Sequence, residues 1–169
     1  EALLKDIRKK RPSFLLGVPT IYTAIINHPK VKDVDFSSLK FCVSGGAPLP
    51  VEIQERFEKL TGAKLGEGWG MTETSPAGTG VHVHGKRKPG SCGLPLPGVM
   101  LDVVDVDDPL KVLPPGQIGE ICIRGPNVMK GYWNAPGANA SAFAGGRFHT
   151  GDIGFIDDEG FVFLVDRKK

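Results

Sequence analysis

The stretch Gly66-Glu67-Gly68-Trp69-Gly70-Met71-Thr72-Glu73-Thr74-Ser75-Pro76 combines alternating glycines with an aromatic ring, a hydroxyl and a carboxylate. Glycines let a backbone approach a ligand without side-chain clash. The ring of Trp69 offers a stacking surface for a base, and Thr72 can donate to a phosphate oxygen. Glu73 is a hard oxygen ligand suited to Mg²⁺. Taken alone, the stretch also fits a tight loop with a buried Trp and a solvated Glu.

The residues before this stretch predict a parallel sheet with flanking helices. Helical spacing of apolar residues alternates with short apolar runs, and this alternation is typical of an α/β fold. The expected helices are residues 1–10, 20–27 and 50–60, and the expected strands are 14–16, 39–43 and 63–65. Ligands of such sheets bind beyond the carboxyl ends of the strands. The two glycine loops, 44–48 and 66–70, are therefore expected at that edge.

The second half of the chain predicts a small antiparallel β-barrel or sheet. Short β-branched runs are broken there by Gly and Pro. The runs are residues 100–106, 119–124, 151–156 and 161–165, and turns are expected at 107–108, 114–116 and 157–160. Residues 135–146 are rich in small residues and predict an exposed loop or a short helix. We place a boundary near 86–93, which gives an α/β subdomain at 1–88 and a β-rich subdomain at 89–169.

Composition excludes several classes of protein. The 169 residues carry a formal charge of +2, and no basic stripe points to nucleic acid. The three cysteines have no metal or redox spacing, and their odd number favours a reducing cytoplasm. The longest apolar stretch, residues 14–18, is far shorter than the ~20 residues that span a bilayer. His82 and His84 have strand spacing but no third metal ligand.

Two further motifs follow the first. They are Phe148-His149-Thr150-Gly151-Asp152 and Val165-Asp166-Arg167-Lys168-Lys169. A carboxylate beside a glycine, as in the first of them, can accept two hydrogen bonds from a ribose diol, although an Asp in a β-turn looks the same. In order and spacing, the three motifs resemble those of the adenylate-forming (AMP-binding) superfamily, and within it the acyl-CoA synthetases. Most members that we compare have Tyr where this chain has Trp69.

The resemblance implies a nucleotide site. Trp69 would pack on adenine, Asp152 would bind the ribose and Arg167 would contact the ribose and phosphate region. Thr72 would contact the α-phosphate and Glu73 would serve Mg²⁺, so these two are the expected catalytic residues. The remaining nucleotide contacts, including the second wall of the adenine slot, are expected at Gly45, Gly46, Ala47, Pro48, Gly70 and Met71.

The resemblance also implies an acyl pocket and a hinge. The acyl group is expected to pass Gly45, Gly68, Ser75 and Pro76. Lys169 aligns with the hinge to a swivelling C-terminal lid, which carries a catalytic lysine and is absent here. The upstream phosphate loop is absent too, so the chain looks like a fragment of the N-terminal domain. His149 is expected to line a pocket, and the family-like segments 93–95 and 131–133 are interpreted as scaffold.

The activity implied for the intact protein is that of a long-chain fatty-acid–CoA ligase. ATP and a carboxylate would give acyl-AMP, and coenzyme A would then form the thioester. An aryl-CoA ligase and a carrier-loading adenylation domain remain open alternatives, as does a nucleotide-binding module without catalysis for these 169 residues. The expected location is the cytoplasm. Peripheral membrane association stays open, because lipid substrates favour it but no amphipathic anchor is obvious.

Overall fold

The computed structural model describes residues 1–82 and 84–168. They form two compact units, each described by itself below. The first comprises Glu1–Gly68 and Val81–Gly90, and the second Trp69–Gly80 and Ser91–Lys169. The predicted boundary near 86–93 stays a prediction, and Trp69–Gly80 lies with the second unit. None of the helices in the described part of the chain is both long and apolar enough to cross a membrane.

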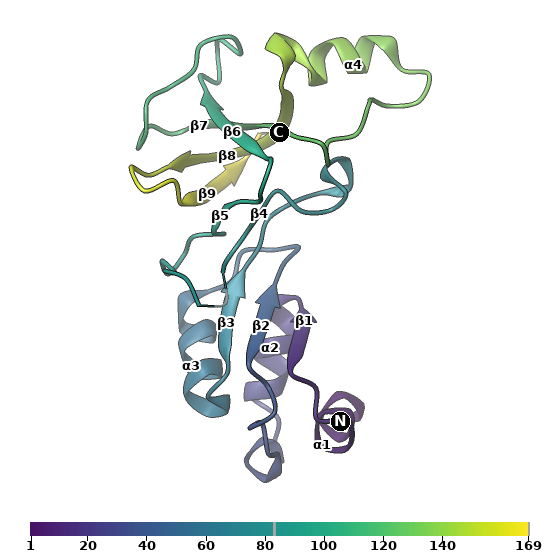
Figure 1. The fold of residues 1–169 in the computed structure, drawn as a ribbon, viewed down its shortest axis with the longest axis vertical. Coiled ribbons are helices and arrows are strands. Elements are labelled where there is room, and N and C mark those ends of the chain that lie inside the picture. Colours follow the sequence, from purple (N-terminus) through teal and green to yellow (C-terminus); the bar gives the residue numbers. More distant parts are fainter. Residues whose placement is uncertain (83, 169) are drawn as a thin grey trace. The chain divides into compact units, whose positions relative to one another are not determined.

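The first unit is a three-stranded parallel sheet with helices, as the sequence predicts (Figure 1). The strands lie in the order β1 (Phe14–Gly17), β2 (Phe41–Ser44) and β3 (Lys64–Glu67). The helices are α1 (Ala2–Lys10), α2 (Pro19–Ile26) and α3 (Val51–Thr61), with a 3₁₀ turn, η1, at Val31–Asp33. Register aligns the carboxyl ends of the strands at Gly17, Ser44 and Glu67. The glycine loops after β2 and β3 therefore begin at the same edge.

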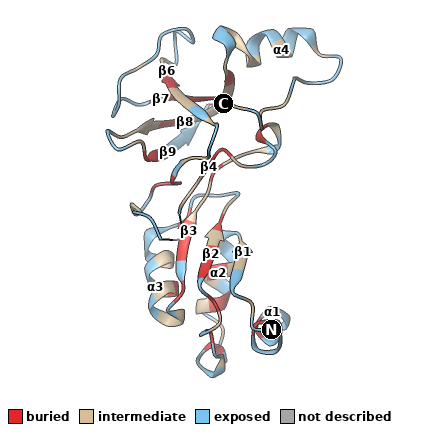
Figure 2. Cartoon of the chain, viewed as in Figure 1, coloured by how far each residue is buried: buried red, intermediate tan, exposed pale blue. Residues whose placement is uncertain are grey.

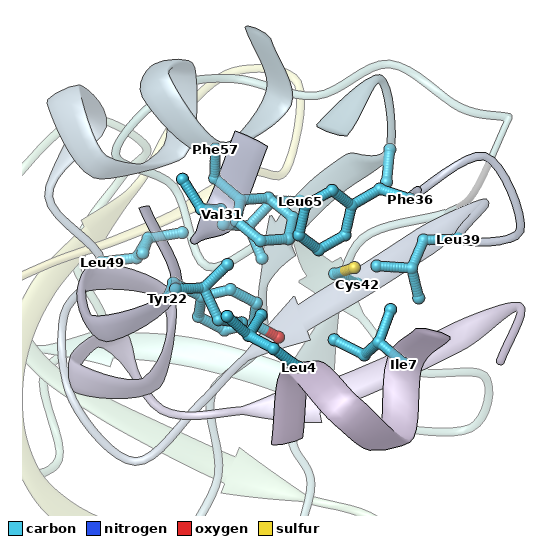
Figure 3. Close-up of a cluster of buried hydrophobic side chains, with 12 residues drawn as sticks. Leu4, Ile7, Tyr22, Val31, Phe36, Leu39, Cys42, Leu49, Phe57 and Leu65 are labelled. Carbon is cyan, nitrogen blue, oxygen red and sulfur yellow. The ribbon is translucent and has the colours of Figure 1, made fainter. Parts of the chain in front are cut away.

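One face of this sheet carries the core of the first unit. Leu15, Cys42 and Leu65 occupy one register row, and the helices cover them. The helical contributors shown in Figure 3 include Leu4, Ile7, Tyr22 and Phe57. The buried hydroxyl of Tyr22 donates to the carbonyls of Leu15 and Val43, at 3.1 and 2.8 Å. This satisfied hydroxyl anchors α2 to the two strands, because an unpaired one would be costly to bury.

The helix boundaries follow local signals in the sequence. Helix α2 begins at Pro19, whose ring fixes the φ angle of a first helical turn. Helix α3 ends at Gly62, which adopts φ 72°, a left-handed conformation that suits glycine. The last turn of α1 contains Arg8, Lys9 and Lys10, whose charges complement the helix dipole. These ends confirm the sequence prediction to within one or two residues.

The second unit is built on an open, four-stranded antiparallel sheet (Figure 1). Its order is β6 (Met100–Val104), β7 (Gly119–Arg124), β8 (Phe148–Ile156) and β9 (Val162–Arg167). The remaining elements are the pair β4 (Thr79–Gly80) and β5 (Leu94–Pro95), helix α4 (Pro136–Ala142), and the 3₁₀ turns η2 (Thr72–Thr74) and η3 (Ala144–Gly146). Strand β7 is the buried centre, as its red colour in Figure 2 shows.

A bulge interrupts the pairing of β7 with β8. Glu120 pairs with Ile153 and Cys122 pairs with His149, so residues 150–152 lie opposite Ile121 alone. A bulge bends its strand and turns side chains to a new direction. Within it, Gly151 adopts φ +74°, which L side chains rarely do. The sequence suggests a strand only from Gly151, but β8 begins at Phe148, because Phe148 and His149 pair with Ile123 and Cys122 on the other side of the bulge.

Candidate functional site

Trp69 and Asp152 meet in the second unit. The indole Nε1 of Trp69 donates a hydrogen bond of 2.7 Å to Oδ2 of Asp152. Trp69 is only 8% exposed and belongs to the core of this unit, with Ile123 and Phe148. Its ring therefore supports the sheet and leaves little surface exposed. The indole N–H points at the carboxylate that the sequence assigns to ribose.

Arg167 lies on the other side of the same carboxylate. Asp152 on β8 is the register partner of Arg167 on β9. The Arg167 Nε lies 3.6 Å from Oδ1 of Asp152. The Asp152 side chain is 13% exposed and that of Arg167 is 75% exposed. The carboxylate is thus held from the interior by an indole, while the guanidinium remains free to reach a ligand from the solvent side.

The loop after Trp69 is folded back tightly on itself. A Cβ on Gly70 would collide with the backbone oxygen of Pro76 and lie 2.6 Å from the Cα of Ala77. The amide of Asn127 donates to the carbonyls of Thr74 and Ala77, at 2.9 and 2.6 Å. The same loop leaves Thr72, Ser75 and Pro76 exposed and Met71 half-buried. The hydroxyl of Thr72 is accordingly on the surface, where a phosphate could reach it.

Glu73 in this loop is bound by an aromatic residue far along the chain. The hydroxyl of Tyr132 donates to Oε1 of Glu73 at 2.9 Å. This hydrogen bond to Glu73 raises the pKa of the Tyr132 phenol above its usual value. The backbone N–H of Met129 donates to the carbonyl of Glu73 at 2.8 Å. This half-buried carboxylate, held at Oε1, is a hard oxygen ligand and so a candidate ligand for a cation.

The loop after β2 belongs to the first unit. Gly46, Ala47 and Pro48 are exposed and Gly45 is half-buried. The N–H of Leu49 donates to Oε2 of Glu67 at 3.1 Å, and this bond holds the end of the loop to β3. Burial raises the pKa of the Glu67 carboxyl to about 7. Gly68 follows directly, and its N–H donates to the carbonyl of Ser44 at 3.0 Å.

The sequence matches the family described as AMP-binding enzyme over residues 1–133. The chain belongs to this family. The family match confirms the resemblance on which the site assignment rests. The parallel sheet confirms the α/β class.

Relatives of the chain include several CoA ligases. The long-chain-fatty-acid–CoA ligase of Bacillus subtilis is 45% identical over 166 residues, which are 98% of this chain and 30% of that protein. The ATP-bound MatB structure from Rhodopseudomonas palustris has a TM-score of 0.90 and 39% identity, over 98% of this chain and 32% of that one. The anthranilate CoA ligase AuaEII in complex with anthranoyl-AMP has a TM-score of 0.89 and 30% identity, over 98% and 32%. The chain thus spans about a third of these relatives.

The structure brings together only some of the residues predicted for the AMP-binding site. Asp152 contacts both Trp69 and Arg167, and Gly70–Pro76 forms one loop in the same unit. Gly45–Pro48 and Gly68 lie in the first unit. Lys169 lies outside the described residues. In the part of the chain that the structure describes, no group of three His, Cys, Asp or Glu could hold a metal, and His82 and His84 are exposed.

Three residues that the AMP-binding motifs do not identify also support this site. Tyr132 contacts Glu73, Asn127 holds the loop after Trp69, and Glu120 accepts a hydrogen bond from Gly151. Tyr132 stands in the family-like segment 131–133, which we interpreted as scaffold, and the other two carried no signal. His149 is packed against Glu120, Cys122 and the carbonyl of Ala144.

Proposed function

We propose that this chain is part of an ATP-dependent acyl-CoA ligase with a fatty acid as its substrate. The observation that supports it most directly is the contact of Trp69 with Asp152 and of Asp152 with Arg167. These residues come from three separate motifs of an AMP-binding chain, and each is assigned to the same nucleotide. Asp152 is mostly buried and Arg167 is mostly exposed, so the pair can offer a carboxylate to a ribose diol and a guanidinium to a phosphate.

The reaction would proceed in two steps. A carboxylate oxygen of the acid attacks the α-phosphorus of ATP, and the bond to the bridging oxygen breaks as pyrophosphate leaves. The thiolate of coenzyme A then attacks the acyl carbonyl carbon, and AMP leaves with the electrons of the carbon–oxygen bond. The protein contributes mainly by positioning and by neutralising charge. Asp152 would bind the ribose hydroxyls, while Thr72 and Arg167 would hold the phosphates.

Glu73 fits the role of a ligand to Mg²⁺. Mg²⁺ is commonly held by one or two carboxylates together with substrate phosphates and water, rather than by a cage of protein ligands. A single half-buried carboxylate with one oxygen bound to Tyr132 matches that pattern. The ion would neutralise charge on the phosphates. The hydrogen bond from Tyr132 would fix the position of the Glu73 carboxylate that binds the ion.

The assignment of Gly45, Gly68, Ser75 and Pro76 to the acyl group stays a prediction. An aryl-CoA ligase is the second candidate, favoured by the likeness to the anthranilate CoA ligase AuaEII. A carrier-loading adenylation domain stays a prediction. We further propose that the 169 residues alone bind nucleotide without turnover, since they span about a third of their relatives.

The test is carboxylate-dependent release of pyrophosphate by the full-length protein that contains this chain. Long fatty acids, short fatty acids and aromatic acids form the panel. We expect release with long fatty acids, loss of it in Asp152→Ala, and wild-type release in Asp158→Ala, which removes an exposed turn carboxylate. Release with aromatic acids alone would favour the second candidate. No release with any acid, or full release by Asp152→Ala, would contradict the proposal. Sedimentation with lipid vesicles tests peripheral membrane association.

A further inference from the structure

Glu120 is an unusual residue for the middle of a sheet. Among the residues that the structure describes, it is the one acidic or basic side chain that is buried, with 4% exposed. A carboxylate in such a place is costly unless it is paired and hydrogen-bonded. The contacts of the Glu120 carboxylate therefore indicate which parts of the sheet it holds together.

Both oxygens of Glu120 are used. Oε1 accepts a hydrogen bond of 2.9 Å from the N–H of Gly151. Oε2 lies 3.5 Å from Nζ of Lys168 and 3.4 Å from Nδ1 of His149. Gly151 and Lys168 are also joined directly, because the N–H of Lys168 donates to the Gly151 carbonyl at 2.6 Å. One buried carboxylate thus ties the bulge of β8 to the end of β9.

The two tied residues are the chain neighbours of the proposed nucleotide ligands. Gly151 precedes Asp152, and Lys168 follows Arg167. In the bulge the Gly151 N–H bonds to the Glu120 side chain instead of a backbone carbonyl of β7. The N–H of Asp152 bonds to the hydroxyl of Thr150, which itself donates to the carbonyl of Ile121 at 2.6 Å. Strand β7 therefore fixes the backbone of Asp152 by two routes.

A nucleophilic role for the neighbouring Cys122 does not fit. Its Sγ lies 3.3 Å from His149 Nδ1, the same nitrogen that faces Glu120. A relay of acid, imidazole and nucleophile uses the two different ring nitrogens. Burial also raises the pKa of the Cys122 thiol to about 12, so it stays protonated. The cluster around Glu120 serves to hold the backbone.

We propose that Glu120 is a positioning residue for ribose recognition, holding Gly151 and Lys168 so that Asp152 meets the ribose hydroxyls with Arg167 opposite it. The inference rests on the proposed function, in which Asp152 binds the ribose. Glu120 would not touch the nucleotide itself. Its removal would weaken nucleotide binding through the contact of Asp152 with the ribose. The adenine contacts and the contact of Thr72 with the phosphate would remain, because Glu120 does not hold the residues that make them.

The experiment compares two ligands rather than two activities. Dissociation constants of the full-length protein are measured by calorimetry for AMP and for 2′,3′-dideoxy-AMP, which lacks both ribose hydroxyls. We expect Glu120→Met to weaken AMP binding about tenfold, on the scale of one hydrogen bond to a charged group. The same variant should bind the dideoxy nucleotide like the wild type, since that ligand has no hydroxyls to lose.

Matched variants complete the test. Glu120→Gln keeps an acceptor for Gly151 and should restore AMP affinity to within about threefold. Glu52→Ala removes an exposed carboxylate, with 78% of its side chain accessible, and should change neither constant. Glu120→Ala is the second loss variant if the Met side chain prevents folding. Equal losses for both nucleotides would overturn the inference by showing a general structural role. A wild-type protein that binds both nucleotides equally would instead contradict Asp152 as ribose ligand, and with it the proposed site.

Discussion

The indole of Trp69 and the carboxylate of Asp152 are 83 residues apart in the chain and 2.7 Å apart in the structure. A tyrosine at this position would have no ring N–H to make this bond. The bond fixes one oxygen of Asp152 from the interior. The other oxygen faces Arg167, at 3.6 Å. Trp69 thereby links the first sequence motif to the second, and β9 supplies the third.

The first prediction concerns this bond. Trp69→Phe removes the N–H and should weaken AMP binding about five- to thirtyfold, the equivalent of roughly 1–2 kcal/mol. In an Asp152→Ala background the same change should have little further effect, because the two residues act together. Calorimetric titration of both variants and the double variant measures this. Trp133→Phe is the control, since Trp133 is 97% exposed. Additive losses would show that the bond does not order Asp152.

The second prediction concerns the loop after Trp69. Gly70→Ala places a methyl group against the backbone of Pro76 and Ala77, which cannot give way like the end of a flexible side chain. We expect a loss of about 1–3 kcal/mol in stability, as for other overpacked sites, together with loss of AMP binding. Gly137→Ala is the matched control in α4, where nothing lies within 4 Å of the new Cβ. The control should leave thermal stability equal or slightly higher. Unchanged AMP binding in Gly70→Ala would contradict the role of the loop.

The third prediction concerns Tyr132 and Glu73. Tyr132→Phe removes the hydroxyl that donates to Glu73 Oε1, so the carboxylate loses one constraint on its direction. We expect two- to tenfold weaker binding of Mn²⁺, used as a spectroscopic substitute for Mg²⁺ with ATP present, from a loss of about 0.5–1.5 kcal/mol. Paramagnetic titration checks it.

A second readout needs no metal. Because Glu73 raises the pKa of the Tyr132 phenol, Glu73→Gln should lower it, and ultraviolet titration measures the change against Tyr132→Phe as the blank. If the Mn²⁺ affinity of Tyr132→Phe equals that of the wild type, Glu73 does not depend on Tyr132.

The fourth prediction concerns pH. Burial raises the pKa of the Glu67 carboxyl to about 7, from the 4.5 of an exposed glutamate. The folded protein therefore binds the proton more tightly than the unfolded chain, so stability falls as pH rises from about 4.5 to 7. Glu67→Gln should remove this fall, which after screening by solvent amounts to about 1–2 kcal/mol. Thermal denaturation across this pH window compares it with Glu55→Gln, an exposed control on α3. Parallel profiles for wild type and Glu67→Gln would refute the prediction.

Much of the fold is predictable from local sequence. Pro19 and Gly62 set helix ends because each has a restricted or unusual backbone preference. The apolar runs at 14–16 and 39–43 predict strands β1 and β2 to within about two residues, the usual uncertainty of such boundaries. The start of β8 is missed because the bulge at residues 150–152 depends on pairing with β7, a partner that periodicity does not specify.

The sequence by itself determined the family, the α/β class and which residues are chemically able to bind a nucleotide, because motif order, glycine spacing and side-chain chemistry are local properties. Tertiary structure alone decided that Trp69 donates to Asp152, that Tyr132 holds Glu73 and that Glu120 is buried beneath Gly151. Each of these contacts joins residues at least 31 positions apart. Strand register and the bulge bring Glu120 to Gly151, and folding of the loop after Trp69 brings Tyr132 to Glu73, so no neighbouring residue in the sequence could indicate them.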